Sequence, residues 1–180
     1  TLGKTDVCKG SLRISQITET KGGPPEGPVD VLLVCSTGGH LLQLVALREA
    51  WEGRTRAWVT FDKSDARSLL RGEPVAYAYG PTNRNIPNLL RNLRLASRLV
   101  RDLRPKVVVT TGAGVAVPFA WIARLRGAKV VYVESFTRID GPSLSCRLIA
   151  PVAARIYAQW PELADSYGRA RYRGNVFLRQ

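Results

Sequence analysis

The stretch Val29-Asp30-Val31-Leu32-Leu33-Val34-Cys35-Ser36-Thr37-Gly38-Gly39-His40 decides the fold of this chain. Its first seven residues form a short apolar run, which is typical of a strand buried on both faces of a parallel sheet. The Ser-Thr-Gly-Gly segment indicates a tight turn, and residues 41–47 then carry leucine and valine at helical spacing. The segment therefore predicts a strand, a turn and a helix in direct succession.

The same alternation continues along the chain. Further strands are predicted at 56–60, 75–79, 106–110, 129–133 and 155–158, and helices at 66–71, 88–103, 115–126 and 143–150. Strands that alternate with helices favour a parallel sheet covered by helices on both faces. We therefore expect a Rossmann-like α/β domain over residues 29–180, preceded by a flexible leader over residues 1–28 that ends in a Gly- and Pro-rich linker.

The net charge of the chain indicates the kind of partner that it binds. The 180 residues carry 27 Lys and Arg against 14 Asp and Glu, a formal net charge of +13, and 21 of the 27 are Arg. Such an excess indicates an anionic partner: nucleic acid, a phosphorylated substrate or an acidic membrane surface. Because no zinc finger, aromatic sheet motif or recognition-helix pattern is present, we expect no nucleic-acid partner.

Local sequence patterns predict neither a membrane-spanning protein nor a disulfide-rich or zinc-binding one. The longest apolar stretch, residues 115–123, is too short to cross a bilayer and contains Pro118, and no signal peptide opens the chain. Cys8, Cys35 and Cys146 are odd in number and far apart, which fits neither a disulfide framework nor a zinc site. With a single His, neither a metal nor a cofactor is expected, and the compartment is predicted to be reducing.

Two small-residue turns are the candidate ligand-binding loops. They follow the first and fourth predicted strands and comprise Ser36, Thr37, Gly38 and Gly39, and Thr111, Gly112, Ala113 and Gly114. Ligands of open α/β sheets bind at the carboxyl ends of the strands, where helix-start N–H groups attract phosphate, so two such turns predict a diphosphate clamp. The alternative is that the glycines only permit tight turns. A nicotinamide site stays open through Asp62, but neither turn has the full Gly-x-Gly-x-x-Gly pattern.

Two titratable residues fall at the same predicted edge. His40 begins the first helix, where the helix dipole keeps it neutral and able to accept a proton. Glu134 ends the fifth strand, where it would bind sugar hydroxyls or act as a base. For each residue a structural role is the alternative: a satisfied hydrogen-bonding histidine, and a carboxylate that caps a neighbouring helix.

The predicted helix at 88–103 has a basic face. Leu89, Leu93, Ala96, Leu99, Val100 and Leu103 are expected to form its apolar face. Phe119 and Trp121 lie near further arginines on the next helix, a combination that suits lipid headgroups, with a solvated charged face as the alternative. The expected membrane-binding set is Arg91, Arg94, Arg98, Arg101, Arg104, Phe119 and Trp121.

Several motifs together resemble a known group of proteins. They are residues 35–41 (CSTGGHL), 58–63 (WVTFDK), 80–85 (GPTNRN), 110–118 (TTGAGVAVP) and 131–136 (VYVESF). In this order they resemble the bacterial PssD/CpsF/EpsE group of polysaccharide-biosynthesis glycosyltransferase subunits. They are also similar to the acceptor-side membrane subunit of the eukaryotic dolichol-linked N-acetylglucosaminyltransferase pair.

The resemblance implies half of a GT-B glycosyltransferase, equivalent to the N-terminal, acceptor-binding domain of MurG and ending at the interdomain linker. A separate donor-binding subunit would hold the nucleotide sugar, a UDP-sugar, and the acceptor would be a polyprenyl-diphosphate-linked saccharide. The expected location is peripheral, at the cytoplasmic face of the cell membrane. The alternative function is a non-catalytic membrane scaffold that activates a partner transferase.

The resemblance also implies roles for individual residues. Gly38, Gly39 and His40 match the first loop that meets the acceptor diphosphate, and residues 112–114 match the second. Glu134 matches the acidic position that lines the acceptor sugar site. Asn83, Arg84 and Asn85 match a motif near the cleft with no assigned role.

Overall fold

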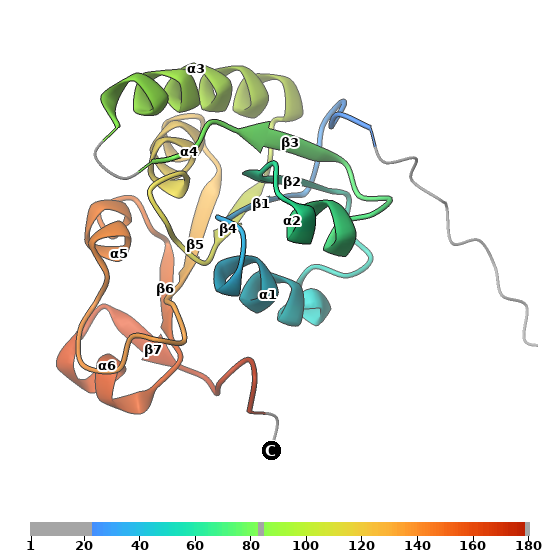
Figure 1. The fold of residues 1–180 in the computed structure, drawn as a ribbon. Coiled ribbons are helices and arrows are strands. Elements are labelled where there is room, and N and C mark those ends of the chain that lie inside the picture. The colour runs from blue at the N-terminus through green and yellow to red at the C-terminus, as the bar shows by residue number, and fades with distance from the viewer. Residues whose placement is uncertain (1–22, 83–84, 179–180) are drawn as a thin grey trace, which may run out of the picture.

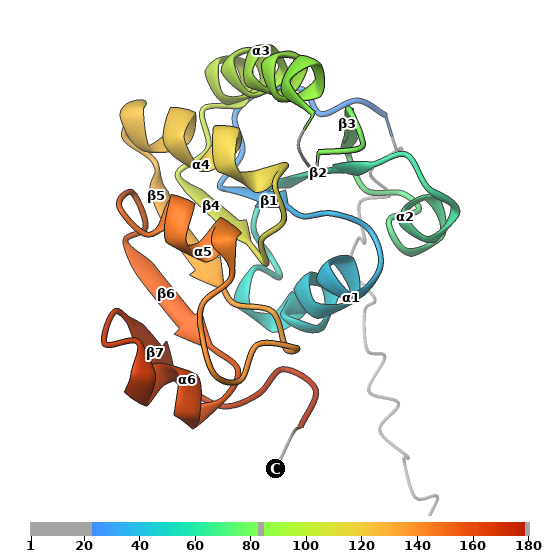
Figure 2. The ribbon, with the colours of Figure 1, turned by 60° about the vertical axis from the view of Figure 1, so that its left-hand side comes forward.

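The first strand is buried along its whole length, as its unbroken apolar run predicts, and it lies inside the sheet with a strand on either side. The structure is a computed structural model, and it describes residues 23–82 and 85–178. These residues form a seven-stranded, all-parallel sheet in the order β3-β2-β1-β4-β5-β6-β7, with helices on both faces (Figures 1 and 2). The expected Rossmann-like α/β class is confirmed.

The elements have the following bounds. The strands are β1 (Val31–Val34), β2 (Arg56–Phe61), β3 (Val75–Ala78), β4 (Val107–Thr110), β5 (Lys129–Val133), β6 (Arg155–Ala158) and β7 (Ala170–Tyr172). The helices are α1 (Gly39–Ala46), α2 (Ser64–Leu69), α3 (Ile86–Leu103), α4 (Ala116–Leu125), α5 (Leu144–Ile149) and α6 (Pro161–Ser166), with a short 3₁₀ helix η1 (Arg48–Ala50).

The short η1 and two elements near the end of the chain were not predicted, and α2 and α3 begin earlier than expected. Helix α6 and strand β7 were not predicted, because each is short and β7 has two exposed residues among its three. Helix α3 begins at Ile86 rather than Asn88, since Pro87 lies in its first turn, where a proline fits a helix.

The strand order explains how helices are distributed between the two faces. From β1 the chain winds outward to β2 and β3, then crosses back to β4 and winds the other way to β7. Because such crossovers are right-handed, connections in opposite directions lie on opposite faces. Helices α1 and α2 therefore cover one face, and α3 to α6 cover the other, where they bury the larger of two apolar cores.

Among the described residues, no helix covers one half of the α1 face. The alternate residues of β4 to β6 that point to this side form the wall of a hollow of about 460 Å³ that also reaches Trp51 of the smaller core. Val107, Val109, Val131 and Tyr157 there are only half-buried, whereas their strand neighbours on the other face are buried. The described helices on this face, α1 and α2, thus cover only the β1–β3 half, which the sequence did not predict.

Candidate functional site

The two Gly-rich turns lie side by side, as predicted. They follow β1 and β4, which are adjacent strands, at the point where the sheet changes its winding direction. In open α/β folds ligands bind at such a switch point, at the carboxyl edge of the sheet, and we call the region where the two turns meet the crevice. Two reciprocal hydrogen bonds join the turns: the Thr111 hydroxyl donates to the His40 carbonyl at 2.8 Å, and the His40 Nδ1 lies 2.8 Å from the Thr111 carbonyl oxygen.

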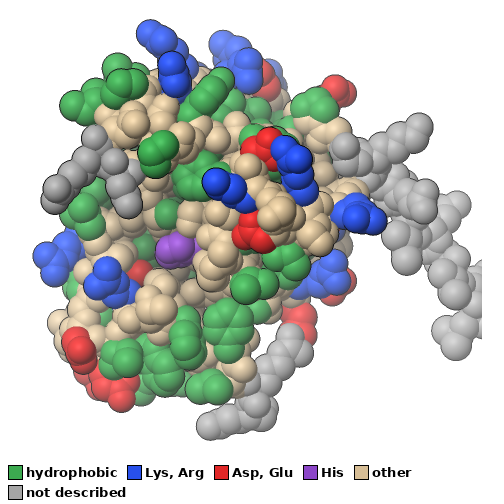
Figure 3. Space-filling view, in the orientation of Figure 1, with side chains coloured by type: hydrophobic (Ala, Val, Ile, Leu, Met, Phe, Trp, Pro, Cys, Tyr) green, Lys and Arg blue, Asp and Glu red, His purple; other side chains and the backbone are tan. Residues whose placement is uncertain are grey.

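These contacts fix the tautomer of His40. A carbonyl oxygen can only accept, so Nδ1 carries the proton and donates to Thr111. The Nε2 atom of the neutral ring is then an acceptor. The ring is half-buried, and Figure 3 shows the purple histidine side chain reaching the surface of the face that Figure 1 presents. Nε2 is therefore equipped to take a proton from a hydroxyl group that enters the crevice.

The first turn combines a positive-φ glycine with a helix start. Gly38 has φ 72°, a conformation that favours glycine, and its N–H donates to the Asp65 carboxylate at 2.7 Å. Gly39, His40 and Leu41 are the first residues of α1, so their N–H groups have no acceptor within the helix. Gly38 and Gly39 are exposed and Ser36 and Thr37 half-buried, so this turn is open to a ligand except at the Gly38 N–H.

The second turn is less open than expected. Thr111 and Gly112 are buried, the Thr111 side chain is used by His40, and the Gly112 N–H donates to the Thr110 hydroxyl. These two residues organise the turn, which corrects the expectation that they contact a ligand. Ala113 and Gly114 are half-buried at the edge of the crevice.

Gly112 is required by its neighbour. Its φ is 103°, and a β-carbon at this position would lie 2.5 Å from the Tyr132 hydroxyl oxygen. Gly114 is also close to another loop, because its β-carbon would lie 3.2 Å from the Thr82 hydroxyl. Gly112 therefore permits a close contact with β5, and Gly114 permits one with the loop before α3.

Glu134 does not face the crevice, which corrects its assignment as a catalytic or sugar-binding group. It is 1% exposed. Its carboxylate accepts from the backbone N–H of Ser135 and of Ser143, each at 2.8 Å, and from the Tyr132 hydroxyl at 3.3 Å. Ser143 is the N-cap of α5, so Glu134 closes the loop that runs from β5 to α5.

The Tyr132 hydroxyl is protonated, as its hydrogen bond to Glu134 requires. Burial, and next the charge of Glu134, raise the pKa of Tyr132. Its hydroxyl therefore stays protonated and donates to Glu134, while the Ser143 hydroxyl lies 3.0 Å away.

Gln43 is a residue of the site that the sequence analysis missed. It lies on α1, is 1% exposed, and bonds through both ends of its amide to the segment after β5. The signal was a polar residue among the leucines of the predicted helix.

The third predicted loop is only partly described. Asn83 and Arg84 lie outside the described residues. Asn85 is the N-cap of α3, where its side chain accepts from the Asn88 N–H at 2.9 Å. Its role here is to begin the helix.

The predicted membrane-binding residues divide into two groups. Arg91, Arg94, Arg98, Arg101 and Arg104 are exposed, and Trp121 is 39% exposed. Phe119 is fully buried in the larger core, so its assignment to a membrane surface is wrong: α4 packs this position against the sheet.

The apolar face of α3 also differs from the prediction. Leu89 and Leu93 are 47% and 44% exposed, because the first half of the helix buries Asn88 and Asn92 instead. Asn92 accepts from the Tyr79 N–H and donates to the Tyr79 carbonyl, and Asn88 donates to the Pro81 carbonyl. Leu89 and Leu93 therefore lie on the surface, among the exposed arginines.

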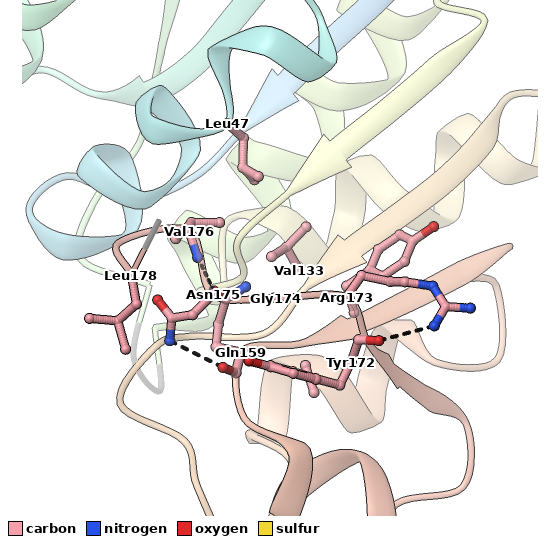
Figure 4. Close-up of a pocket in the computed structure, with 11 residues that line it drawn as sticks. Leu47, Val133, Gln159, Tyr172, Arg173, Gly174, Asn175, Val176 and Leu178 are labelled. Atoms are coloured by element: carbon pink, nitrogen blue, oxygen red, sulfur yellow. Dashed lines mark hydrogen bonds between the residues drawn. The ribbon is translucent and has the colours of Figure 1, made fainter. Parts of the chain in front are cut away.

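A separate pocket lies beside the C-terminal segment. It has a volume of about 670 Å³ and is bounded by the ends of β5, β6 and β7 and by residues 173–178 (Figure 4). Gln159 fastens this segment, because its side chain accepts from the Val176 N–H and its carbonyl accepts from the Asn175 side chain. The pocket includes neither His40 nor either Gly-rich turn, so it is distinct from the candidate site.

The described part of the chain contains neither a membrane-spanning helix nor a metal-binding cluster. In it no helix is long and apolar enough to cross a membrane. Nor do its His, Cys, Asp and Glu side chains gather in groups of three or more that could hold a metal ion.

Comparison with known proteins places the chain in a family. Residues 81–176, more than half of the sequence, match the family described as oligosaccharide biosynthesis protein Alg14 like. The chain belongs to the Alg14-like family.

Similar curated proteins span nearly the whole chain. The UDP-N-acetylglucosamine transferase subunit ALG14 of Eremothecium gossypii is 30% identical over 184 residues, which cover 85% of this chain and 82% of that protein. The human protein of the same name is 24% identical over 196 residues, which cover 92% and 91% respectively.

Solved structures share the fold at low sequence identity. MurG of Acinetobacter baumannii has a TM-score of 0.64 at 18% identity, and UDP-N-acetylglucosamine 2-epimerase of Rickettsia bellii has a TM-score of 0.64 at 11% identity. Each alignment covers 82% of this Alg14-like chain but only 45% of the solved chain. These likenesses show the fold alone, and the chain spans less than half of either structure.

Proposed function

We propose that this chain is the acceptor-binding subunit of a two-component glycosyltransferase. The enzyme transfers a sugar from a UDP-sugar to a polyprenyl-diphosphate-linked saccharide, in polysaccharide biosynthesis of the PssD/CpsF/EpsE kind. The observation that carries the proposal is His40: its Nδ1 is tied to Thr111, and its Nε2 is left as an acceptor where the two Gly-rich turns meet.

The chemistry follows from this geometry. A hydroxyl oxygen of the acceptor sugar attacks the anomeric carbon of the donor, the bond from that carbon to the UDP oxygen breaks, and UDP leaves with the electron pair. His40 Nε2 takes the hydroxyl proton as the new bond forms. The N–H groups at the start of α1 hold the diphosphate, because a helix N-terminus attracts anions.

A donor-binding partner is part of the proposal. The curated relatives are named as subunits of a UDP-N-acetylglucosamine transferase, and the chain aligns with 45% of MurG. We propose that the partner supplies the domain that holds the UDP-sugar, and that residues 29–180 are the acceptor domain. His40 is the one titratable side chain within the two Gly-rich turns, and it is half-buried.

Membrane association at the cytoplasmic face completes the proposal. Exposed apolar side chains gather on α3, α4 and α5, and the Trp121 indole N–H donates to the Leu148 carbonyl across the last two. We call this set the α3–α5 face: Ile86, Leu89, Leu90, Leu93, Trp121, Leu125, Leu144 and Leu148. Apolar side chains among exposed arginines suit a surface helix on anionic lipid.

Reconstitution tests the function. The chain is mixed with a candidate partner, a GT-B donor-domain protein, together with UDP-[³H]N-acetylglucosamine and a polyprenyl-diphosphate-linked monosaccharide in detergent. We expect transfer only with both proteins present. His40→Ala should lower kcat by about 10²–10⁴-fold, since it removes the general base.

A matched variant and one contrary outcome make this test decisive. Leu42→Ala changes an exposed residue of the same helix and should leave transfer unchanged. Unchanged transfer by His40→Ala would refute the catalytic assignment. Equal transfer by the partner alone would favour the non-catalytic scaffold instead.

A further inference from the structure

Gln43 is a buried amide with a specific partner at each end. Its Nε2 donates to the Glu134 carbonyl at 2.7 Å, and its Oε1 accepts from the Phe136 N–H at 3.1 Å. The carbonyl requires a donor and the N–H requires an acceptor, so only one orientation of the amide satisfies both. Gln43 thus fastens α1 to the segment after β5, 91 and 93 residues further along the chain.

These bonds close a ring of contacts around the crevice. From Gln43 the ring runs through Glu134 to the Tyr132 hydroxyl, which lies against Gly112 in the second turn. Thr111, the residue before Gly112, bonds to His40, and α1 leads back from His40 to Gln43. Each Gly-rich turn is therefore connected to β5 as well as to the other turn.

The helix that carries His40 depends on such contacts for its placement. Helix α1 has eight residues and no side-chain cap at its start, so it is too short to be stable by itself. Leu41 and Leu44 bury it against the sheet, but apolar packing is not directional. The bonds at His40 and at Gln43, one helical turn apart, fix its rotation and its position along the sheet.

We infer that Gln43 is a positioning residue, which holds α1 against the loop after β5 and thereby sets the direction of His40 Nε2. The inference rests on the proposed function, in which Nε2 accepts the proton of the acceptor hydroxyl. Gln43 itself does not touch the substrate. Its removal therefore affects the rate of transfer more than the binding of either substrate.

Two substitutions separate positioning from folding. Gln43→Glu keeps the shape of the side chain but replaces the donor, and Gln43→Leu removes both bonds. The matched controls are Gln159→Glu and Gln159→Leu. Gln159 is 2% exposed and also accepts a backbone N–H through its side chain, but its hydrogen bonds run to the C-terminal segment.

Kinetics of the reconstituted pair give the first measurement. We expect either Gln43 substitution to lower kcat at pH 8 by about tenfold or more, as for a lost buried hydrogen bond, with KM for both substrates within about twofold. In Gln43→Glu the introduced carboxyl can donate again once it is protonated, and burial raises its pKa. The kcat of Gln43→Glu relative to the unmodified pair should therefore recover as the pH falls from 8 to 6, and that of Gln159→Glu should not.

Nuclear magnetic resonance of the chain alone gives the second measurement. The chain has a single His, so its imidazole signals belong to His40. We expect a slowly exchanging Nδ1–H signal that exchanges faster in Gln43→Leu and is unchanged in Gln159→Leu. Gln43→Glu, compared at pH 6 and pH 8, replaces Gln43→Leu if the latter does not fold.

The outcomes distinguish this inference from the proposed function. The positioning role would be overturned if both Gln43 variants had the same kcat as the unmodified, active pair. Unchanged His40 signals in a folded Gln43 variant would also overturn it. If the unmodified pair shows no transfer, the proposed function fails, and the His40 signals alone decide whether Gln43 positions the ring.

Discussion

At the scale of single residues, one group at the crevice and two buried groups behind it illustrate how neighbours determine a role. His40 and Glu134 were equal candidates from their places at strand ends, yet Glu134 is enclosed by two backbone N–H groups and a tyrosine. In the sequence, Gln43 is one polar residue in a predicted apolar helix, yet in the structure it joins two distant segments. A buried polar group must find partners, and these lie more than 90 residues away in the case of Gln43.

Gly112 provides a prediction at this scale. Gly112→Ala should destabilise the fold by about 2 kcal/mol or more, because φ 103° is strained for alanine and its β-carbon would meet the Tyr132 hydroxyl at 2.5 Å. The free energy of urea unfolding measures the effect. Gly141→Ala is the matched control, since nothing lies within 4 Å of a β-carbon there.

Adding Tyr132→Phe to Gly112→Ala separates the two causes. Because Tyr132→Phe also removes the hydrogen bond to Glu134, the loss caused by Gly112→Ala is measured in both the unmodified and the Tyr132→Phe backgrounds. The loss should be smaller in the Tyr132→Phe background, and what remains there reports the backbone strain. An equal loss in the two backgrounds would show that the close contact contributes nothing.

At the scale of elements, α3 shows how a sequence pattern misled about a helix face. Its leucines and arginines predict one apolar and one basic face, and residues 95–103 follow that pattern. In the first half, Asn88 and Asn92 are buried because they bond to the backbone of residues 79–81. Hydrophobicity alone could not predict this, since the partners belong to the loop that precedes the helix.

The start of β1 provides a pH-dependent prediction. Lys106 first, and then Thr55, lower the pKa of Asp30 from 3.8 to about 2, so this carboxylate joins the beginnings of β1, β2 and β4. A lowered carboxyl pKa contributes stability above pH 3.8, and the contribution is lost as the pH falls towards 2. The unfolding free energy of the unmodified chain minus that of Asp30→Asn should therefore rise from pH 2 to pH 4 and then level off.

A suitable control keeps the comparison specific. Asp102→Asn changes an exposed carboxylate that pairs only with its neighbour Arg101 among the described residues. No pH dependence of the difference for Asp30→Asn, or an equal one for Asp102→Asn, would contradict the role of Asp30.

At the scale of the whole molecule, the α3–α5 face leads to a prediction about membranes. The chain should sediment with vesicles of phosphatidylcholine and phosphatidylglycerol at 50 mM salt, and binding should fall steeply at 500 mM salt because the arginine attraction is screened. Leu89→Ser together with Leu93→Ser should weaken binding by about tenfold, through lost apolar burial.

Leu42→Ser together with Leu69→Ser is the matched control. These leucines are 50% and 42% exposed on α1 and α2, which cover the opposite face of the sheet. Equal loss of binding in both pairs of variants, or equal binding to vesicles of phosphatidylcholine alone, would contradict docking through the α3–α5 face.

The sequence by itself determined the α/β class, six of the seven strands and the two turns that meet at the switch point, because apolar periodicity and turn residues act over short distances. It also located His40 and the basic helix. Only the tertiary structure decided which polar groups are open to the crevice, that Phe119 is core and that leucines of α3 are exposed. It also decided that no helix of the described residues covers half of one sheet face. The reason is that burial and hydrogen-bond partners depend on segments brought together by the strand order, which local patterns do not encode.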